Sequence, residues 1–507
     1  MELNREKLNL PKYSERIIQF GEGNFLRCFA DWQIDILNKE ANFNSGVAVV
    51  RPINYDTVPL LNTQDGLYTA IIRGINEKGE VVKDYRIISS VNREIPIYKE
   101  FDEYLKLAHN PEMRFIISNT TEAGIVYSDK DKYEDRPQNT YPAKLTRLLH
   151  ERFTVFNGDM SKGFILMPCE LIDYNGEELK KIVLKYADLW NLGEEFKKWL
   201  VEGNIWCSTL VDRIVTGYPH AEKEELKKEL GYEDRFMTTG EYFYLFVIQG
   251  PKDILTKELK LDKVNLNILI TEDLKPYKMR KVGILNGAHT SLVPVAYLYG
   301  IDTVREAMEN SDINNFIENA INQEIIPALD MDKKELIEFK EAVIKRFRNP
   351  YVKHMLIDIA LNSTSKYKTR ILPQVLEYNK RTGKLPQRLL FSLAALIRFY
   401  KGVRENGDAI NLRDDKQFLD MYANLWSNFN GDYKHIAETV LGMKSHWEVD
   451  LNTIPEMTDT VTLYLEKIDT LGVKEALKDL EIPIICDADI GHVKPQLAIV
   501  NFKGVNL

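Results

Sequence analysis

The stretch that decides the fold is Arg16–Leu26, RIIQFGEGNFL, where a strand-like apolar run leads straight into a turn with two glycines. A helical pattern follows, with apolar residues on one face at spacings of four, three and four: Phe25, Phe29, Trp32 and Ile36. Val47–Val50 (VAVV) is the next strand-like run. This order predicts a βαβ unit, in which Gly21 allows a tight turn and Gly23 lets backbone N–H groups approach a pyrophosphate.

The dinucleotide-binding pattern is incomplete, and a plain strand-to-helix turn is the alternative interpretation. Its third glycine would stand where the chain has Leu26. An acidic residue that binds the ribose of NAD is expected after the second strand, but the sequence there is Arg51-Pro52-Ile53-Asn54. Arg51 is either a contact for the 2′-phosphate of NADP or a solvated loop residue.

Further strand-like runs alternate with helical patterns over the first 270 residues, which is typical of parallel strands joined by crossover helices. These runs are 68–73, 114–118 and 164–167, and more strand-like sequence at 242–249 and 267–271 closes this section. After about Lys275 helical patterns dominate, at 276–299, 303–325, 333–348, 386–403 and 415–442. Strand-like sequence returns at Ile482–Ile485 and Leu497–Phe502. The predicted fold class is α/β plus α, with a Rossmann-type dinucleotide-binding domain over 1–270 and a mostly α-helical domain over 271–507.

The composition excludes several classes of protein. The chain has 507 residues, 67 Lys plus Arg and 76 Asp plus Glu, and its net charge of −9 argues against a nucleic-acid or membrane-surface binder. The four cysteines lie far apart and the histidines lack metal-ligand spacing, so we expect no disulfide framework and no metal. The N-terminus lacks an apolar leader, and the uncharged run 283–301 carries polar residues unsuited to a bilayer. We therefore expect a cytoplasmic protein.

The segment Lys278–His289, KMRKVGILNGAH, carries the most informative polar residues. On an α-helix with Lys281 at 0°, Asn286 falls at about 140° and His289 at about 80°, so the three side chains share one polar sector. Reduction of a carbonyl by hydride needs a proton donor and hydrogen-bond donors for the developing alkoxide. A lysine whose pKa is lowered by partial desolvation can be that acid, and the base in reverse. The alternative is a solvated lysine beside a packing Asn and a core His.

A set of motifs, in this order along the chain, resembles the mannitol dehydrogenase family of long-chain polyol dehydrogenases. The motifs are IIQFGEGNFLR (17–27), TTEAG (120–124), CELIDYNG (169–176), STLVDRIVTGYP (208–219), LNGAHT (285–290), and RFRNP (346–350) followed by SK (365–366). Within the family, the members that interconvert D-tagaturonate and D-altronate are the most similar. The resemblance implies an active site between a Rossmann-type domain and a helical domain. It also implies NAD(H)-linked, metal-free reduction of a keto-uronate to an aldonate in hexuronate catabolism.

Carried over residue by residue, the resemblance makes Lys281 the general acid/base, with Asn286 and His289 polarising or positioning the carbonyl. It places the cofactor against the first strand, its glycine turn and the T-E pair: Ile18, Phe20, Gly21, Glu22, Gly23, Asn24, Phe25, Thr121 and Glu122. Asp212 and Arg213 match the family's V-D-R segment. They are either substrate-side residues or a buried ion pair that braces the site.

One departure from the polyol members concerns the substrate site. Those members have Asn where this chain has Leu171, and Asn175 is the candidate replacement. A uronate carries a carboxylate that mannitol lacks, so a cationic partner is expected in the pocket. In NSTSKYKTR, Lys366 matches the family's basic substrate-side residue and ranks first, and Arg370 ranks second. The alternative is a solvated run of charges.

The expected partner is thus a small keto-uronate or aldonate. Fructuronate reduction and mannitol dehydrogenation are the alternatives within the family. A non-catalytic sensor of NAD or of a sugar acid is the alternative from another class, and the intact lysine, asparagine and histidine set argues against it. The oligomeric state is left open.

Overall fold

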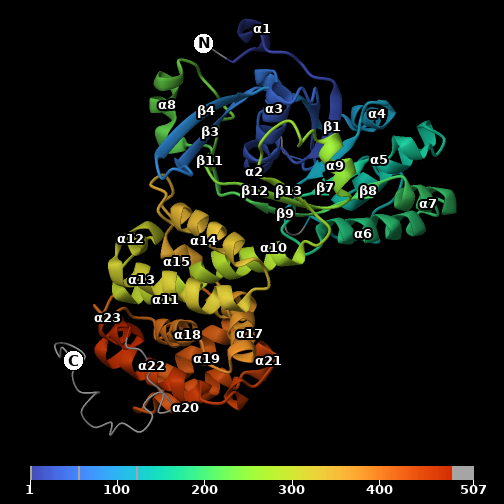
Figure 1. Ribbon diagram of the computed structural model, residues 1–507. Coiled ribbons are helices and arrows are strands. Elements are labelled where there is room, and N and C mark those ends of the chain that lie inside the picture. Colours follow the sequence, from blue (N-terminus) through green and yellow to red (C-terminus); the bar gives the residue numbers. More distant parts are fainter. Residues whose placement is uncertain (1–2, 55–57, 122–123, 482–507) are drawn as a thin grey trace. The chain divides into compact units, whose positions relative to one another are not determined.

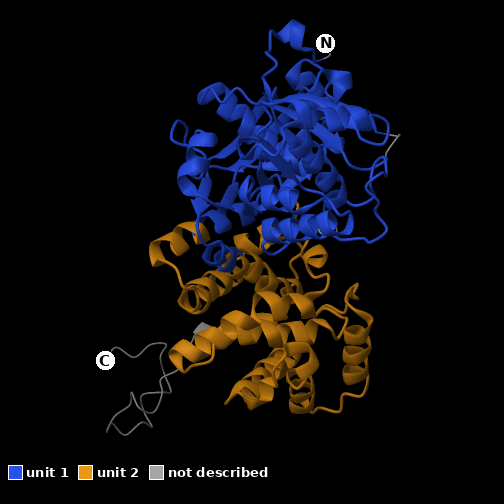
Figure 2. Cartoon of the chain, turned by 90° about the vertical axis from the view of Figure 1, so that its right-hand side faces the viewer, with its two compact units in different colours: residues 1–281, 341–352 blue, residues 282–340, 353–507 orange. Residues whose placement is uncertain are grey.

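The computed structural model describes residues 3–54, 58–121 and 124–481. The chain divides into two compact units (Figure 2). Unit 1 comprises residues 1–281 and 341–352, and unit 2 comprises residues 282–340 and 353–507. The predicted domain boundary is a single cut after residue 270. In the structure, unit 1 runs to residue 281 and also includes residues 341–352.

Unit 1, in which β1, β7 and β8 are labelled in Figure 1, is built on a six-stranded parallel sheet with the order β5-β2-β1-β6-β7-β8. The strands are β1 Glu15–Phe20, β2 Gly46–Arg51, β5 Val91–Pro96, β6 Phe115–Ser118, β7 Ile165–Pro168 and β8 Ile205–Trp206. This is the strand order of a Rossmann fold, whose ligands bind where the order reverses, at the carboxyl ends of β1 and β6. The predicted α/β plus α class is confirmed.

Alternate residues of the central strands pack into two different cores. Ile17, Val49 and Ile117 contribute to one cluster, whereas Ile18 and Val50 contribute to the other. Both faces of the sheet are therefore buried, which explains why these strands read as continuous apolar runs rather than as alternating ones. One face is covered by α4 Phe101–Lys106, α5 Tyr141–Val155, α6 Asn175–Leu189 and α7 Glu194–Glu202.

The other face meets the first helices and two smaller sheets. The predicted helix after the glycine turn is interrupted at Phe29, whose φ of −120° and ψ of −73° separate α2 Asn24–Cys28 from α3 Ala30–Glu40. The smaller sheets have the orders β10-β11-β3-β4 and β13-β12-β9. Their strands are β3 Tyr68–Ile75, β4 Val81–Ile88, β9 Ser208–Asp212, β10 Val215–Gly217, β11 Thr238–Glu241, β12 Leu245–Gln249 and β13 Ile268–Thr271.

The run 68–73 was predicted as a parallel strand joined by crossover helices, and that assignment is wrong. β3 pairs antiparallel with β4 and parallel with β11, outside the six-stranded sheet. The reason is the short turn 76–80, in which Asn76 N donates to Glu80 O and Gly79 has a φ of +85°. This turn makes a hairpin, so the third strand of the Rossmann sheet is β5.

Unit 2 is helical, as predicted. Its central helix, α18 Gln387–Phe399, is buried from Leu389 onward and packs against α11 Ala288–Tyr299, α13 Ser311–Ala320 and α22 Met457–Leu471. A helix that is apolar on every side belongs in a core. The predicted strands 482–485 and 497–502 lie outside the described residues. Among the residues described, no helix combines the length and apolar character needed to cross a membrane.

Candidate active site

The glycine turn stands at the carboxyl end of β1, where a Rossmann fold binds its nucleotide. Gly21 has a φ of +111°, and a Cβ atom there would lie 3.0 Å from Asn119 O, so only glycine fits without strain. Gly23 begins α2, and no described atom lies within 4 Å of the position its Cβ would take. The backbone is therefore accessible at Gly23, which fits the close approach of a pyrophosphate.

The other residues predicted around the cofactor have different positions. Ile18 and Phe20 are fully buried in the core, so they support the turn from beneath. The Oδ1 atom of Asn24 accepts a hydrogen bond of 2.8 Å from Arg27. Phe25 lines the cavity described below. Leu26, at the position of the third glycine, is a core residue.

The guanidinium of Arg51 makes its hydrogen bonds within the protein. Its Nε donates to Glu94 Oε1 at 2.6 Å, Nη1 to Val58 O at 2.8 Å and Nη2 to Pro59 O at 3.0 Å. The carboxylate of Glu22, in the glycine turn, lies 3.7 Å from Nε. The side chain is almost fully buried. These contacts do not support the alternative in which Arg51 binds a 2′-phosphate.

The loop after β6 carries an unusual backbone conformation. Thr121 is exposed and has a φ of +76°, which is a true outlier for a β-branched residue. Such strain concentrates at functional sites. Glu122, the other residue of the predicted pair, lies outside the described residues.

The loop after β7 is tied to the loop after β6 by Glu170. Its carboxylate accepts hydrogen bonds from Thr120 N at 3.0 Å, Thr120 Oγ1 at 2.9 Å and Ser118 Oγ at 3.1 Å. Burial raises the pKa of Glu170. Leu171, where polyol members have Asn, is 63% exposed.

Asn175 is fully buried and holds backbone groups. Its Nδ2 donates to Pro168 O and Glu170 O at 3.0 Å, and its Oδ1 accepts from Thr209 N at 2.9 Å. This amide fixes the start of α6 to β7 and β9. Its contacts therefore give no support to the role of replacing the family asparagine beside the substrate.

A cavity of about 660 Å³ opens in unit 1 at the carboxyl ends of the strands, a size typical of small-molecule sites. It is lined by Phe25, Asn119, Thr121, Glu170, Leu171, Val211, Asp212, Arg213 and Lys281. The Nζ of Lys281 donates to Val211 O at 2.9 Å. Four residues predicted for the site, namely Phe25, Thr121, Asp212 and Lys281, are thus brought together at one cavity.

Asp212 is anchored by an arginine that the sequence did not single out. Arg346 donates to Asp212 Oδ1 at 2.8 Å and Oδ2 at 3.0 Å, and to Glu241 at 2.8 and 3.0 Å. Burial opposes ionisation of Asp212, but the charges of Arg346 and Lys281 hold its pKa below the usual value. Arg213 donates to the backbone of Cys28 and Glu241. The interpretation as a bracing ion pair fits Asp212, although its partner is Arg346 and not Arg213.

Lys281 begins a π-helix, Lys281–Gly287, between α10 Lys275–Arg280 and α11. Its hydrogen bonds span five residues instead of four, so the α-helical angles expected for Lys281, Asn286 and His289 do not apply to this stretch. Short π-helical insertions occur often at functional sites. The predicted angles assumed a regular α-helix, which this stretch does not form, and the shared sector of the three side chains stays a prediction.

The remaining predicted residues lie in unit 2. His289 is buried, and its ring stands edge-on to that of His354, with centroids 5.1 Å apart. Thr290 Oγ1 donates to Asn286 O at 2.9 Å. Arg370 Nη1 donates to Thr290 Oγ1 at 3.4 Å, whereas Lys366 Nζ donates to Ile359 O at 2.8 Å. Arg370 is thus linked through the Thr290 hydroxyl to the backbone of Asn286, and Lys366 has a different contact.

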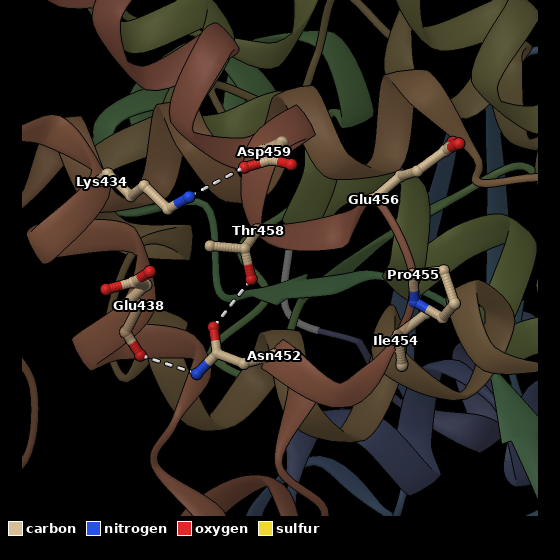
Figure 3. Close-up of a pocket in the computed structure, with 8 residues that line it drawn as sticks. All are labelled: Lys434, Glu438, Asn452, Ile454, Pro455, Glu456, Thr458 and Asp459. Atoms are coloured by element: carbon tan, nitrogen blue, oxygen red, sulfur yellow. Dashed lines mark hydrogen bonds and ion pairs between the residues drawn. The ribbon is translucent and has the colours of Figure 1, made fainter.

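A second cavity, of about 440 Å³, lies in unit 2 (Figure 3). Lys434 and Asp459 pair across it at 3.3 Å, and Asn452 Nδ2 donates to Glu438 O at 2.9 Å. Thr458 Oγ1 donates to Asn452 Oδ1 at 2.8 Å, and we assign this cavity no ligand. Within the described chain, no three His, Cys, Asp or Glu side chains gather in a way that could hold a metal ion.

Comparison with known proteins agrees with this architecture. Residues 15–263 match the family model described as the mannitol dehydrogenase Rossmann domain, and residues 273–469 match the mannitol dehydrogenase C-terminal domain. The fold, the glycine turn and these matches define a two-domain oxidoreductase of the Rossmann class. More narrowly, the chain belongs to the mannitol dehydrogenase family.

Curated relatives include the altronate oxidoreductase of Enterobacter sp. (strain 638), 57% identical, and that of Escherichia coli O6:K15:H31 (strain 536 / UPEC), 58% identical. Each alignment covers 94% of this chain and 99% of the relative. Among solved structures, mannitol 2-dehydrogenase of Pseudomonas fluorescens, in a ternary complex with NAD and D-mannitol, is 21% identical with a TM-score of 0.65. That match covers 95% of this chain and 99% of the other. A D-sorbitol dehydrogenase, 20% identical over 94% of this chain and 100% of its own, has a TM-score of 0.78.

Proposed function

We propose that this protein interconverts D-tagaturonate and D-altronate with NAD(H), using Lys281 as the general acid/base. The observation that carries the proposal is the 57–58% identity to altronate oxidoreductases over almost their full length. The cavity that contains Lys281 at the carboxyl ends of the Rossmann strands supports it. NAD(H) is the cofactor, in keeping with the family's Rossmann domain and with the internal contacts of Arg51.

NAD(H), when bound, would supply the hydride chemistry at the keto carbon, in reduction and in the reverse oxidation. The turn from Gly21 to Phe25 holds the pyrophosphate through backbone N–H groups, because Gly23 leaves its approach open. Thr121, which lines the cavity, would lie beside the cofactor.

The chain's own side chains handle the proton. During reduction the ammonium of Lys281 gives a proton from Nζ to the carbonyl oxygen as that oxygen gains negative charge, and a secondary alcohol results. Asn286 and His289 donate hydrogen bonds to the same oxygen. In oxidation the neutral amine of Lys281 takes the hydroxyl proton back. Asn175 and Asp212 have no substrate contact in this scheme, because their polar atoms are held by the backbone and by Arg346.

The test is a side-by-side assay of NADH oxidation with D-tagaturonate, D-fructuronate and D-fructose, with NADPH run in parallel. We expect turnover of D-tagaturonate with NADH to exceed every other combination. Preference for D-fructuronate or D-fructose would replace the proposed substrate and leave the Lys281 mechanism standing. Efficient use of NADPH would contradict the role assigned to Arg51.

A further inference from the structure

We propose that Arg370 binds the carboxylate of the substrate and thereby selects sugar acids over neutral sugars. This inference rests on the proposed function, since it concerns the same substrate. Arg370 is the last residue of α16 Ser363–Arg370 in unit 2. The sequence ranked it behind Lys366, and the contacts of the two side chains reverse that order.

The backbone at Arg370 lies against the π-helix beside the proposed catalytic residues. A Cβ atom on Gly287, the residue after Asn286, would stand 3.4 Å from Arg370 O. The guanidinium reaches the same region, because its Nη1 donates to Thr290 Oγ1 at 3.4 Å. Thr290 follows His289, and its hydroxyl donates to Asn286 O at 2.9 Å. Arg370 therefore lies against the backbone of the stretch that carries Asn286 and His289, the two residues proposed to bind the reacting carbonyl oxygen.

Arg370 differs in charge pairing from the other arginines of unit 2. Six of the seven form an ion pair with a carboxylate: Arg305–Glu309, Arg381–Glu377, Arg388–Glu324, Arg398–Asp469, Arg404–Asp302 and Arg413–Asp358. Over the part of the chain that the structure describes, Arg370 has no carboxylate partner. It is nevertheless partly buried, and burial lowers the pKa of its guanidinium.

A partly buried guanidinium loses part of its hydration. Without a bound anion, no ion pair compensates for that loss. A substrate carboxylate would compensate for the lost hydration, because its two oxygens match the planar N–H pairs of arginine. The nearby hydroxyl of Thr290 then orients the guanidinium. The site is thus suited to a carboxylate on a molecule whose carbonyl lies against Asn286 and His289.

The two lysines of the same helix are less suitable. Lys366 Nζ is held by Ile359 O at 2.8 Å, and burial together with the charge of Arg370 lowers its pKa. Lys368 forms a 2.9 Å ion pair with the exposed Glu448. Of the three cations in this helix, Arg370 alone combines partial burial with the absence of any described backbone-carbonyl or carboxylate partner for its side chain.

The experiment compares Arg370→Gln and Arg370→Lys with the matched control Lys368→Gln, and with Lys366→Gln as the competing candidate, in the full-length enzyme. Steady-state kinetics are measured with D-tagaturonate and with neutral D-fructose, and D-altronate binding is measured by calorimetry. Arg370→Gln loses a charged, hydrogen-bonded pair. We therefore expect kcat/KM for D-tagaturonate to fall, and Kd for D-altronate to rise, by roughly 10- to 150-fold. Arg370→Lys retains part of the affinity, and the Lys368→Gln control stays within about threefold of wild type. Lys366→Gln loses less affinity than Arg370→Gln. Added guanidinium ion partly restores Arg370→Gln, which also shows that the variant is folded.

Several results would overturn the inference. One is an equal loss with D-fructose, and another is unchanged D-altronate affinity in Arg370→Gln. A larger loss of D-altronate affinity in Lys366→Gln than in Arg370→Gln would assign the substrate carboxylate to Lys366 instead. Failure of the proposed function is separable, because it would show in the wild-type enzyme as no turnover of D-tagaturonate. The calorimetric comparison tests Arg370 in either case.

Discussion

At the scale of single residues, the proposed chemistry depends on the amine of Lys281, which lines the unit 1 cavity and donates to Val211 O. Replacing it with Gln keeps a polar side chain but removes the proton donor. We expect Lys281→Gln to lower kcat for D-tagaturonate roughly 10²- to 10⁴-fold, the usual contribution of general acid catalysis. NADH binding, followed by fluorescence titration, should change little.

The matched control is Lys278→Gln, one turn earlier, where the lysine pairs with Asp173 on the surface at 2.5 Å. We expect this variant to keep wild-type kcat. A comparable fall of kcat in both variants would mean that helix packing, and not proton transfer, explains the loss.

Some site residues were predictable from the sequence because their chemistry depends on local spacing. Gly21 and Gly23 follow a strand and precede a helix, and that order is enough to place them at the turn between β1 and α2. Arg51 was not predictable, since its partner Glu94 is 43 positions away. Asn175 is similar: the backbone groups that hold its amide come from β7, the following loop and β9. Contacts made only by tertiary folding decide whether such a side chain is available to a ligand.

At the scale of elements, the β1–α2 turn predicts opposite outcomes for its two glycines. Gly21→Ala forces a side chain into a φ of +111° and to 3.0 Å from Asn119 O, so we expect a loss of stability of at least about 1–2 kcal/mol. Gly23 has a φ of −64° and open space around its Cβ position, so Gly23→Ala should fold normally. The added methyl group of Gly23→Ala should instead raise the KM for NADH, because it occupies the approach of the pyrophosphate.

Thermal unfolding and NADH kinetics of the two variants check this pair. An unchanged KM for NADH in Gly23→Ala would show that the turn does not bind the cofactor. Wild-type stability of Gly21→Ala would show that the turn accommodates a side chain after all.

Elements with strong periodicity were predicted well, and those that depend on partners were not. The strands of the parallel sheet are buried on both faces, and their apolar runs made them visible. The π-helix at Lys281 has no distinct signal in KVGILNG, because its register is set by what packs around it. The wrong sheet assignment of β3 had a local cause. The short turn at 76–80 joins β3 to β4 as a hairpin, so β3 cannot be followed by a crossover helix.

At the scale of the whole molecule, the two-domain class was predictable, but the composition of unit 1 was not. Helix α14 Lys333–Phe347 begins among residues of unit 2, and from Glu341 to Val352 the chain belongs to unit 1. Arg346 lies in this returning segment and pairs with Asp212 and Glu241, which are 134 and 105 positions away. A boundary drawn along the chain cannot contain such a segment.

The returning segment leads to a prediction about the integrity of unit 1. Arg346→Gln leaves two buried carboxylates without their cation, so we expect the free energy of unfolding of unit 1 to fall by roughly 3–5 kcal/mol. Arg348→Gln, two positions on and exposed, should change it by no more than about 0.5 kcal/mol. Hydrogen exchange localises the effect, since β9 and β11, which carry Asp212 and Glu241, should lose amide protection while α18 keeps it. Adding Glu241→Gln to Arg346→Gln should recover part of the loss, because one unpaired charge is removed. Equal stability of the two single variants would show that residues 341–352 are not needed to hold the strands beside Lys281.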